Sequence, residues 1–434
     1  MNLPALPLVL LLGVAMMPAV PEARVFDVRG FGARGDGNTL DTVAIQTALD
    51  RCSQAGGGTV EFPRGVYFSQ PLTISSRTTV LLATGATLLA SPAQTNFLKD
   101  GGNWLDHKSN DDFKPFIRGT GLTDIAITGN GTIDGNGLNW WGPAEEVRTR
   151  NPGRPPLPRP DLIALNDCRN VRLAGVKLIN SPRSHCVLNN CENLVVDGLT
   201  IQSPAGAANT DGLDAVNCRN VVISRCVIDT GDDNISIKSG RKIEGHAFGC
   251  ENITVTGCNF LHGHGMSIGS ATVGGVHHVM VKDCHFDGTE NGLRIKSGRD
   301  RGGLVDDVSY SDITMINVHP AVSIVSYYQY STNDKYPKND PAQPVSETTP
   351  RVRNVCISNV TAFCTQDAGL IIGLPESMIT NVVLENVHIT AATGLTIQNA
   401  KGIRFNNSTV SVKSGLEFSA ENAEVEGLKN TRQN

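Results

Sequence analysis

The stretch "TGDDNISIKSG" (230–240) places two carboxylates side by side, at Asp232 and Asp233, just before residues that alternate apolar and polar. Such alternation is typical of a β-strand, on which neighbouring side chains point to opposite faces. Two acids that act together must therefore sit at a bend before the strand. Paired carboxyl groups suit acid–base chemistry, because one can keep a proton while the other stays ionised.

Three further stretches align with this one by their strand pattern: "NTDGLDAV" (209–216), "GHGMSIGS" (263–270) and "NGLRIKSG" (291–298). Their first apolar strand residues form one column, made of Leu213, Ile235, Met266 and Leu293. The column two residues earlier is polar and contains Asp211, Asp233, His264 and Asn291. The basic residues close to these columns are Lys238, Arg294 and Lys296. If the stretches stack, three acids, one histidine and several cations share one face.

The elements that must stack these stretches are short repeated units such as "NLVVDGLTI" (193–201) and "NVVISRCVI" (220–228). Their first apolar positions are Val171, Leu194, Val221, Ile253, Val279, Val308, Val355 and Val382. Steps mostly in the twenties, with strands between turns, are typical of a solenoid. We predict an all-β fold, a single-stranded right-handed parallel β-helix of about ten coils over roughly 25–412, with rungs roughly 4.8 Å apart.

The segment "DTVAIQTALDRCSQAGG" (41–57) predicts a capped amphipathic helix. Its apolar residues are Ala44, Ile45, Ala48, Leu49 and Cys52. A solenoid leaves strand edges open at its ends unless something covers them. We expect this helix to cover the N-terminal end.

Most of the 11 cysteines occupy two fixed positions of the repeat. Three residues before a coil's first apolar position lie Cys168, Cys191, Cys218 and Cys250, and five residues after it lie Cys226, Cys258 and Cys284. These positions favour free, buried thiols in interior ladders, with disulfides between rungs as the alternative. The sequence contains no Cys-x-x-Cys pair, so the cysteine spacing does not point to a structural metal site.

Composition and the N-terminal segment restrict the class of protein. The net charge of -5 argues against a nucleic-acid binder. Residues 1–23 contain one short apolar run, which predicts a signal peptide rather than a membrane span. No later run is apolar enough for a membrane helix. We therefore expect residues 24–434 to form one monomeric catalytic domain that is secreted or periplasmic and has no membrane partner.

The acidic cluster has two alternative roles. Acids in the turns of a β-helix often only accept backbone N–H bonds, which would explain any one of these residues alone. Clustered carboxylates also bind Ca²⁺, but His264, Arg294 and Lys296 would oppose a divalent ion. We expect no metal and no cofactor.

Glycosidic bond cleavage requires the residue types found in this cluster. One protonated carboxyl serves the leaving oxygen, and one ionised carboxylate serves water or direct attack. Mutual repulsion among the acids is expected to keep a proton on Asp232. The fork of Arg294 and the ammonium of Lys296 suit the carboxylate of a uronate better than a neutral sugar.

The motifs "NTDGLD", "TGDDNISIKSG", "GHGMSIGS" and "RIKSG", in this order, resemble those of the polygalacturonase family, glycoside hydrolase family 28. The resemblance runs from about Val25 to about Thr390 and includes "GNGTIDGNGLNWWG" (129–142). It implies metal-free, inverting hydrolysis of a galacturonic-acid chain in polygalacturonate or pectin. One departure is Asn234, where many members have Cys.

The resemblance implies a role for each residue of the cluster. Asp232 would be the general acid, and Asp211 with Asp233 would hold and activate water. His264 would tune that pair. Substrate-binding residues would be Arg294, Lys296 and Asn209.

Two long stretches between strands are expected to wall the binding groove, because long loops in a compact repeat usually carry function. One is residues 323–344, where Tyr327 or Tyr328 is expected to touch a sugar. The other is residues 140–160, whose Trp140 and Trp141 have packing against the coil as an alternative role. Two other activities remain open on this fold: a lyase or other pectate- or rhamnogalacturonan-active enzyme, and a non-catalytic polysaccharide-binding module.

Overall fold

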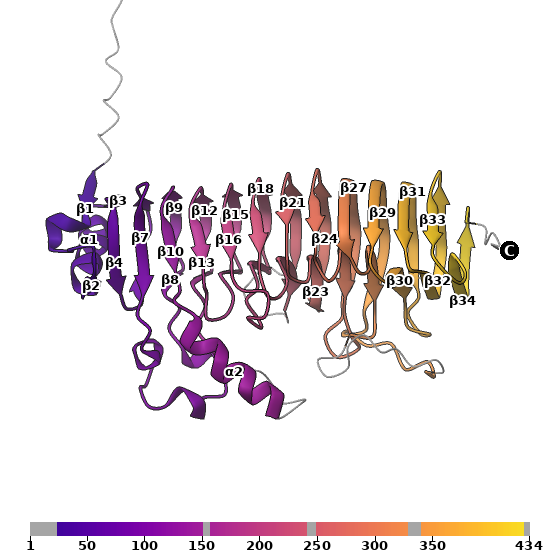
Figure 1. Cartoon of the computed structure of the whole chain (residues 1–434), viewed down its shortest axis with the longest axis horizontal. Helices are drawn as coiled ribbons and strands as arrows, with labels where there is room; N and C mark the ends of the chain where they lie inside the picture. The colour runs from indigo at the N-terminus through magenta and orange to yellow at the C-terminus, as the bar shows by residue number, and fades with distance from the viewer. Residues whose placement is uncertain (1–23, 151–156, 241–248, 329–339, 429–434) are drawn as a thin grey trace, which may run out of the picture.

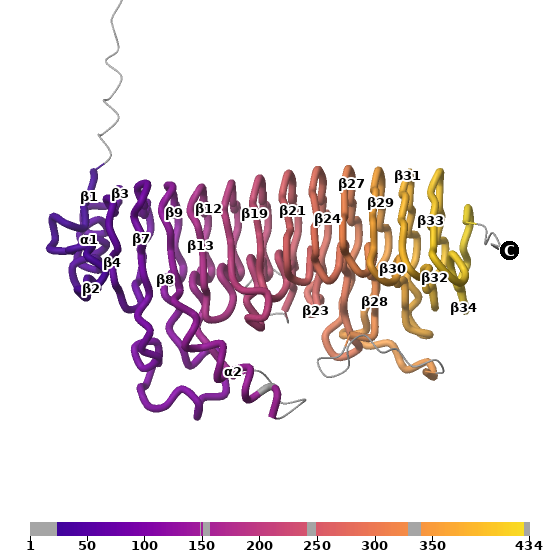
Figure 2. Tube along the Cα trace, viewed as in Figure 1, coloured from indigo at the N-terminus to yellow at the C-terminus, as the bar shows by residue number. Residues whose placement is uncertain are grey.

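The computed structural model describes residues 24–150, 157–240, 249–328 and 340–428. The expected signal peptide, residues 1–23, lies outside the described residues. Figure 1 shows one elongated stack of strands that runs from β1 at one end to β34 at the other. The trace in Figure 2 follows the same path as a succession of similar coils.

The named strands pair in parallel with strands one coil away, and the pairings form three ladders. The first ladder consists of β1 (Val25–Asp27), β3 (Gly58–Phe62), β6 (Thr78–Leu82), β9 (Thr123–Gly129), β12 (Arg169–Ala174), β15 (Glu192–Asp197), β18 (Arg219–Ser224), β21 (Cys250–Thr256), β24 (Val276–Lys282), β27 (Leu304–Val318), β29 (Arg351–Cys364), β31 (Ile379–Ala391), β32 (Thr393–Asn406) and β34 (Phe418–Glu426).

The second ladder lies one corner further along each coil. It consists of β2 (Asp36–Leu40), β4 (Gly65–Ser69), β7 (Ala86–Ala90), β10 (Thr132–Asp134), β13 (Lys177–Ile179), β16 (Thr200–Gln202), β19 (Val227–Asp229), β22 (Asn259–Phe260), β25 (His285–Asp287), the later parts of β27, β29 and β31, and β33 (Thr409–Val412).

The third ladder contains the strands of the sequence motifs. It consists of β5 (Leu72–Thr73), β8 (Ile117–Thr120), β11 (Ile163–Asn166), β14 (Cys186–Asn189), β17 (Leu213–Val216), β20 (Ile235–Ser239), β23 (Met266–Thr272), β26 (Leu293–Lys296), β28 (Val322–Val325), β30 (Asp367–Ile372) and the first parts of β32 and β34.

The predicted parallel β-helix is confirmed, and it has more coils than the ten expected. The coils built from residues 25–90 lack the Asn-led unit from which coils were recognised in the sequence. A further coil, ending in β34, follows the last such unit and carries the stack past residue 412 to Glu426.

The leading Asn of each unit has a conformational role. Asn170, Asn193, Asn220 and Asn252 all have positive φ angles, between 54° and 58°. Asn tolerates this left-handed conformation better than most residues with a side chain. The amide of Asn220 donates to Asn193 Oδ1 at 3.1 Å, and that of Asn252 donates to Asn220 Oδ1 at 3.1 Å. The repeat therefore begins with Asn because that residue both forms the turn and links it to the next coil.

The cysteines follow the prediction of free thiols. All eleven are free, and nine are buried; Cys356 is exposed and Cys364 is intermediate. The buried thiols lie in the same interior core as the aliphatic columns of the three ladders. They pack as small apolar side chains rather than as cross-links.

The predicted capping helix is α1 (Thr42–Gln54), which follows the short 3-10 helix η1 (Val28–Phe31). Its buried face consists of Ile45, Ala48, Leu49 and Cys52. Figure 1 shows α1 at the N-terminal end of the stack, where it contacts β1 and β3. The helix therefore covers an end whose strand edges would otherwise be open to water.

Two insertions project from the same side of the stack in Figure 1. The first is formed by two segments of the chain. The segment between β7 and β8 contains η2 (Gln94–Phe97), η3 (Trp104–Asp106) and η4 (Asn110–Asp112), and the segment between β10 and β11 contains α2 (Leu138–Arg150). Trp140 is buried among the rings of Phe97, Trp104 and Phe113, with centroids 5.1–5.9 Å away, and Trp141 Nε1 donates to Ser181 O at 3.0 Å. Trp140 therefore packs the two segments together, and Trp141 links α2 to the coils. The second insertion precedes β29, so β17, β20, β23 and β26 lie between the two.

Candidate active site

The register of the third ladder brings the predicted columns together. Leu213 pairs with Ile235, Ile235 with Met266, and Met266 with Leu293. These apolar side chains are buried in the core. The adjoining column, which faces outward, contains Asp214, Ser236, Ser267 and Arg294. Alternation along the strands therefore predicted the register correctly, and it places the acids of the preceding bends on one face.

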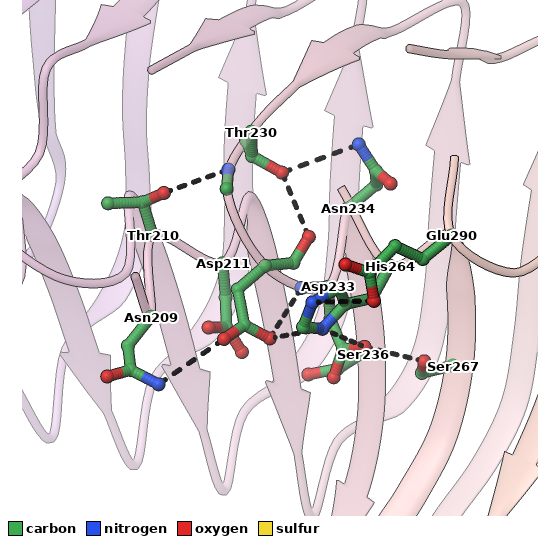
Figure 3. Close-up of polar contacts among 12 residues, drawn as sticks. Asn209, Thr210, Asp211, Thr230, Asp233, Asn234, Ser236, His264, Ser267 and Glu290 are labelled. Atoms are coloured by element: carbon green, nitrogen blue, oxygen red, sulfur yellow. Dashed lines mark hydrogen bonds and ion pairs between the residues drawn. The ribbon is translucent and has the colours of Figure 1, made fainter. Parts of the chain in front are cut away.

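Asp232 has polar contacts from two neighbouring coils. Its Oδ1 lies 3.0 Å from His264 Nδ1, and its Oδ2 accepts a bond from Asn209 Nδ2 at 3.3 Å. The backbone N–H of Asp233 also donates to Asp232 Oδ1 at 2.8 Å. The bend thus turns the two adjacent acids toward different partners, and Figure 3 shows Asn209 on one side of the acidic cluster and His264 on the other.

Asp233 is held by a cation and a hydroxyl. Lys296 Nζ lies 2.7 Å from Asp233 Oδ2 and 3.0 Å from Oδ1, and Ser267 Oγ donates to Oδ1 at 2.7 Å. Asp211, one coil away, accepts from Lys238 Nζ at 3.0 Å. Lys238 also donates to Asp214 at 2.8 Å. Asp233 therefore has Lys296 as its cationic partner, whereas Asp211 and Asp214 share Lys238.

The pair formed by Asp232 and His264 is charged. Burial opposes the imidazolium, but the hydrogen bond to Asp232 and the charges of Asp232, Asp233 and Glu290 outweigh it and raise the pKa of His264 to about 9. Burial likewise opposes the Asp232 carboxylate. The hydrogen bond and charge of His264, together with Lys296, nevertheless hold the pKa of Asp232 well below its usual range.

The expected protonation of Asp232 by repulsion is therefore wrong for the protein without substrate. Attraction to His264 and Lys296 outweighs repulsion by the neighbouring acids. The acid with a raised pKa is Asp211, whose burial and whose proximity to Asp214 outweigh the opposing charge of Lys238. The predicted separation of pKa values exists, but the raised values belong to Asp211 and His264 rather than to Asp232.

Stability should depend on the His264 pair at alkaline pH. The folded-state pKa of about 9 lies above the ordinary histidine pKa of 6.5, so the contribution is complete below about pH 6.5 and is lost as pH rises through about 9. We expect the free energy of unfolding to fall by roughly 2–3 kcal/mol over that window, after allowance for partial exposure of the side chain. Denaturant titrations at several pH values measure this fall.

His264→Gln is the matched variant for that measurement, because a glutamine side chain does not titrate. The pH-dependent fall should be smaller in this variant than in the wild type by the amount given above. Parallel curves for the two proteins would show that His264 carries no such charge.

The two tyrosines expected near the sugar have different surroundings. Tyr328 has its ring over the cations of the site, 5.6 Å from the Arg294 guanidinium and 5.3 Å from Lys296 Nζ. Tyr327 is buried, and its hydroxyl donates to Asp340 at 3.0 Å. The structure therefore brings Tyr328 to the cluster, whereas Tyr327 anchors the second insertion. The contact expected between Tyr327 and a sugar does not fit this orientation.

Glu290 and Arg159 were not singled out from the sequence, and Asn234 was noted there only as a departure from the family pattern. Glu290 Oε2 lies 3.2 Å from His264 Nε2, so the imidazole lies between two carboxylates. Asn234 donates to His262 O at 2.7 Å and accepts from Gly265 N, which joins the two bends. Arg159, from the first insertion, donates to Asn209 Oδ1 at 2.9 Å. Glu290 precedes Asn291 of the polar column, and that position was the available signal.

The cluster also contains three potential metal ligands. One atom each from Asp232, Asp233 and His264 lies within 4.8 Å of the others. However, Lys296 Nζ already lies 2.7 Å from Asp233, and the charged His264 lies 3.0 Å from Asp232. A divalent ion placed among these ligands would be repelled by both cations. Metal-free chemistry therefore stays our prediction.

Clustered carboxylates, a histidine and two cations on one outer face of a parallel β-helix supply the groups that glycosidic bond cleavage requires. Residues 52–413 match the family model of the glycosyl hydrolases family 28, and the chain belongs to this family. The protein is thus a glycoside hydrolase. Family membership favours hydrolysis over the lyase and over the non-catalytic binding module considered above.

Relatives and solved structures agree with this assignment. The chain is 34% identical over 326 residues to an endo-polygalacturonase of Pectobacterium carotovorum subsp. carotovorum, covering 70% of this chain and 76% of the relative. It is 31% identical to a probable polygalacturonase of Arabidopsis thaliana, covering 91% and 81%. The polygalacturonase structure from Erwinia carotovora ssp. carotovora aligns with a TM-score of 0.70 and 30% identity, covering 90% and 94%.

Proposed function

We propose that the protein hydrolyses α-1,4-galacturonosidic bonds of polygalacturonate or pectin by an inverting acid–base mechanism. The observation that carries this proposal is the placement of Lys296 and Arg294 on the strand beside the acids, with Lys296 Nζ 2.7 Å from Asp233. Cations this close to a catalytic carboxylate suit a substrate that is itself anionic. The family and the polygalacturonase relatives support the same substrate class.

Asp232 is proposed as the general acid and His264 as its proton source. The raised pKa of His264, about 9, favours a proton on its ring, and His264 Nδ1 lies 3.0 Å from Asp232 Oδ1. That separation is a hydrogen-bond distance, so the proton can pass to Asp232 as the leaving glycosidic oxygen approaches. Asp232 then donates it to that oxygen, and the bond to the departing sugar breaks.

Asp233 and Asp211 are proposed to hold the attacking water. Asp233 is held by Lys296 and Ser267, and it accepts the proton that the water loses as it attacks the anomeric carbon. The raised pKa of Asp211 leaves that side chain able to donate a hydrogen bond to the same water. Such a shared proton orients one water between two carboxyl groups.

Asn209, Arg294, Lys296 and Tyr328 are proposed to bind the substrate. Arg294 and Lys296 offer positive charge to a uronate carboxylate, and the Tyr328 ring stacks beside both. The experiment that tests the proposed function is product analysis with purified protein on polygalacturonate. Hydrolysis yields saturated oligogalacturonides with new reducing ends, whereas a product that absorbs in the near ultraviolet would indicate elimination instead.

We also propose that residues 24–434 act as one exported catalytic domain after removal of residues 1–23, as a monomer outside the cytoplasm. Among the residues with described coordinates, no helix combines the length and apolarity needed to cross a bilayer. The reason for proposing export is the substrate, a wall polysaccharide that lies outside the cell. N-terminal sequencing of protein recovered from the medium or periplasm should begin near residue 24.

A further inference from the structure

Arg159 is a buried cation that lies beside the proposed general acid. Its side chain is 1% exposed and lies on the first insertion, in the rigid stretch Pro158 to Pro160. Among the residues that the structure describes, no carboxylate lies within ion-pair distance of its guanidinium. Burying a charge costs several kcal/mol unless a partner compensates it, so its position needs a reason.

Neutral oxygens surround the guanidinium. Arg159 Nε donates to Leu157 O at 3.2 Å, and Nη1 donates to Pro182 O at 3.1 Å and to Ala208 O at 3.0 Å. These carbonyls belong to the insertion and to the loops before β14 and β17. Such bonds fix the orientation of the guanidinium but do not neutralise its charge.

The remaining bond leads to the catalytic cluster. Arg159 Nη2 donates to Asn209 Oδ1 at 2.9 Å, and Asn209 Nδ2 donates to Asp232 Oδ2 at 3.3 Å. An amide can present either its oxygen or its nitrogen to a neighbour. Because Arg159 can only donate, it fixes the Asn209 oxygen on its own side and turns the amide N–H₂ toward Asp232.

We propose that Arg159 is a positioning residue for the general acid, acting through Asn209 and through its own charge. This inference rests on the proposed function, because it assigns the general acid to Asp232. The insertion that walls one side of the site thus also supplies the group that orients its acid. Burial and the nearby charge of Arg183 oppose the guanidinium, and the charges of Asp232, Asp161 and Asp211 favour it.

The alternative is that Arg159 only braces three loops. The pH profile of turnover separates the two roles, because loss of a brace lowers stability without moving the pKa of the acid. The charged groups that face Asp232 are His264, Lys296, Asp233, Asp211 and Arg159. Loss of the Arg159 charge makes ionised Asp232 less favourable, so the pair formed by Asp232 and His264 keeps its shared proton to higher pH.

The test compares Arg159→Met with the wild type on polygalacturonate across pH. We expect the alkaline limb of the kcat profile to move up by about one pH unit, and kcat at the optimum to fall at least about tenfold, since misplacement of a reacting group is costly. KM should change less than about twofold. Arg150→Met, an exposed arginine on the same insertion, is the matched control and should behave as the wild type.

Two further variants keep the test decisive. Combined with Asn209→Ala, Arg159→Met should add little to the loss caused by Asn209→Ala alone, because the two residues act in one chain of contacts. If Arg159→Met fails to fold, Arg159→Lys retains the charge without the fork, and its alkaline limb should stay near that of the wild type while kcat falls.

An alkaline limb of Arg159→Met that superimposes on that of the wild type, with normal wild-type activity, would overturn this inference alone. A limb of Arg159→Lys displaced from that of the wild type would overturn it as well. Wild-type protein without hydrolytic activity on polygalacturonate would overturn the proposed function and, with it, the role of Asp232.

Discussion

Asp232→Asn is expected to lower the turnover of polygalacturonate at least about a hundredfold while KM changes little, which is the usual size of a general-acid contribution. Asn keeps the shape of the side chain and can still accept from His264, but it cannot transfer a proton to the leaving oxygen. His264 Nδ1, which lies 3.0 Å from Asp232 Oδ1 in the wild type, then faces a side chain that cannot pass a proton on. Steady-state kinetics on polygalacturonate measure the change.

Asp229→Asn is the matched control for this variant. Asp229 lies in the same coil, three residues earlier, and its carboxylate contacts His262 at 2.9 Å instead of the cluster. Its replacement should leave turnover near the wild-type value. Near-normal turnover in Asp232→Asn would show that another group protonates the leaving oxygen.

Lys296→Ala is expected to lower kcat/KM on polygalacturonate at least about thirtyfold, because it removes one partner of a buried charge pair. Lys296 is 5% exposed and contacts both oxygens of Asp233, so its loss leaves that carboxylate buried without its cation. Without its cation the buried, ionised form of Asp233 is disfavoured, so less of the carboxylate is available as the base that activates water. A cation for the substrate carboxylate is lost at the same time.

Paired assays on polygalacturonate and on highly methyl-esterified pectin separate these two effects. Loss of the base lowers kcat on both substrates, whereas loss of the uronate contact raises KM only on the charged one. Lys177→Ala, which removes an exposed lysine on β13, is the control. An unchanged KM on polygalacturonate would show that Lys296 serves the base and not the sugar.

The fold was predictable because the same pattern of turn and apolar residues recurs from coil to coil. A turn residue, mostly Asn, and the apolar positions after it recur in the central coils, so the register of β17, β20, β23 and β26 followed from alternation alone. The N-terminal coils carry only weaker copies of this pattern, at residues 78–89 and 123–135, so their number was underestimated. Stacking of like residues also predicted buried, free cysteines.

The electrostatics of the site could not be predicted in the same way. Sequence columns place Asp233 above Asp211, but the distance from His264 to each acid depends on how the bends turn. In the structure the ring reaches Asp232 at 3.0 Å and Asp233 only at 4.0 Å. Because His264 lies closer to Asp232, the pKa of Asp232 is lowered, and the raised pKa values are those of Asp211 and His264.

The positions of residues supplied by the insertions also could not be predicted from the repeat pattern. Arg159 reaches the site from outside the coils, and no periodicity relates it to Asn209. The two adjacent tyrosines, Tyr327 and Tyr328, could not be separated by sequence, because only the packing of the second insertion decides which ring is buried.

The central claim is that Asp232 protonates the leaving oxygen while water held by Asp233 and Asp211 attacks from the opposite face of the sugar. Proton NMR of the first-formed reducing end during hydrolysis of polygalacturonate tests it most directly. Attack by water in a single displacement inverts the α-linkage, so the β-anomer should appear first and then equilibrate. Initial appearance of the α-anomer would mean retention through a covalent intermediate and would contradict this assignment of the three acids.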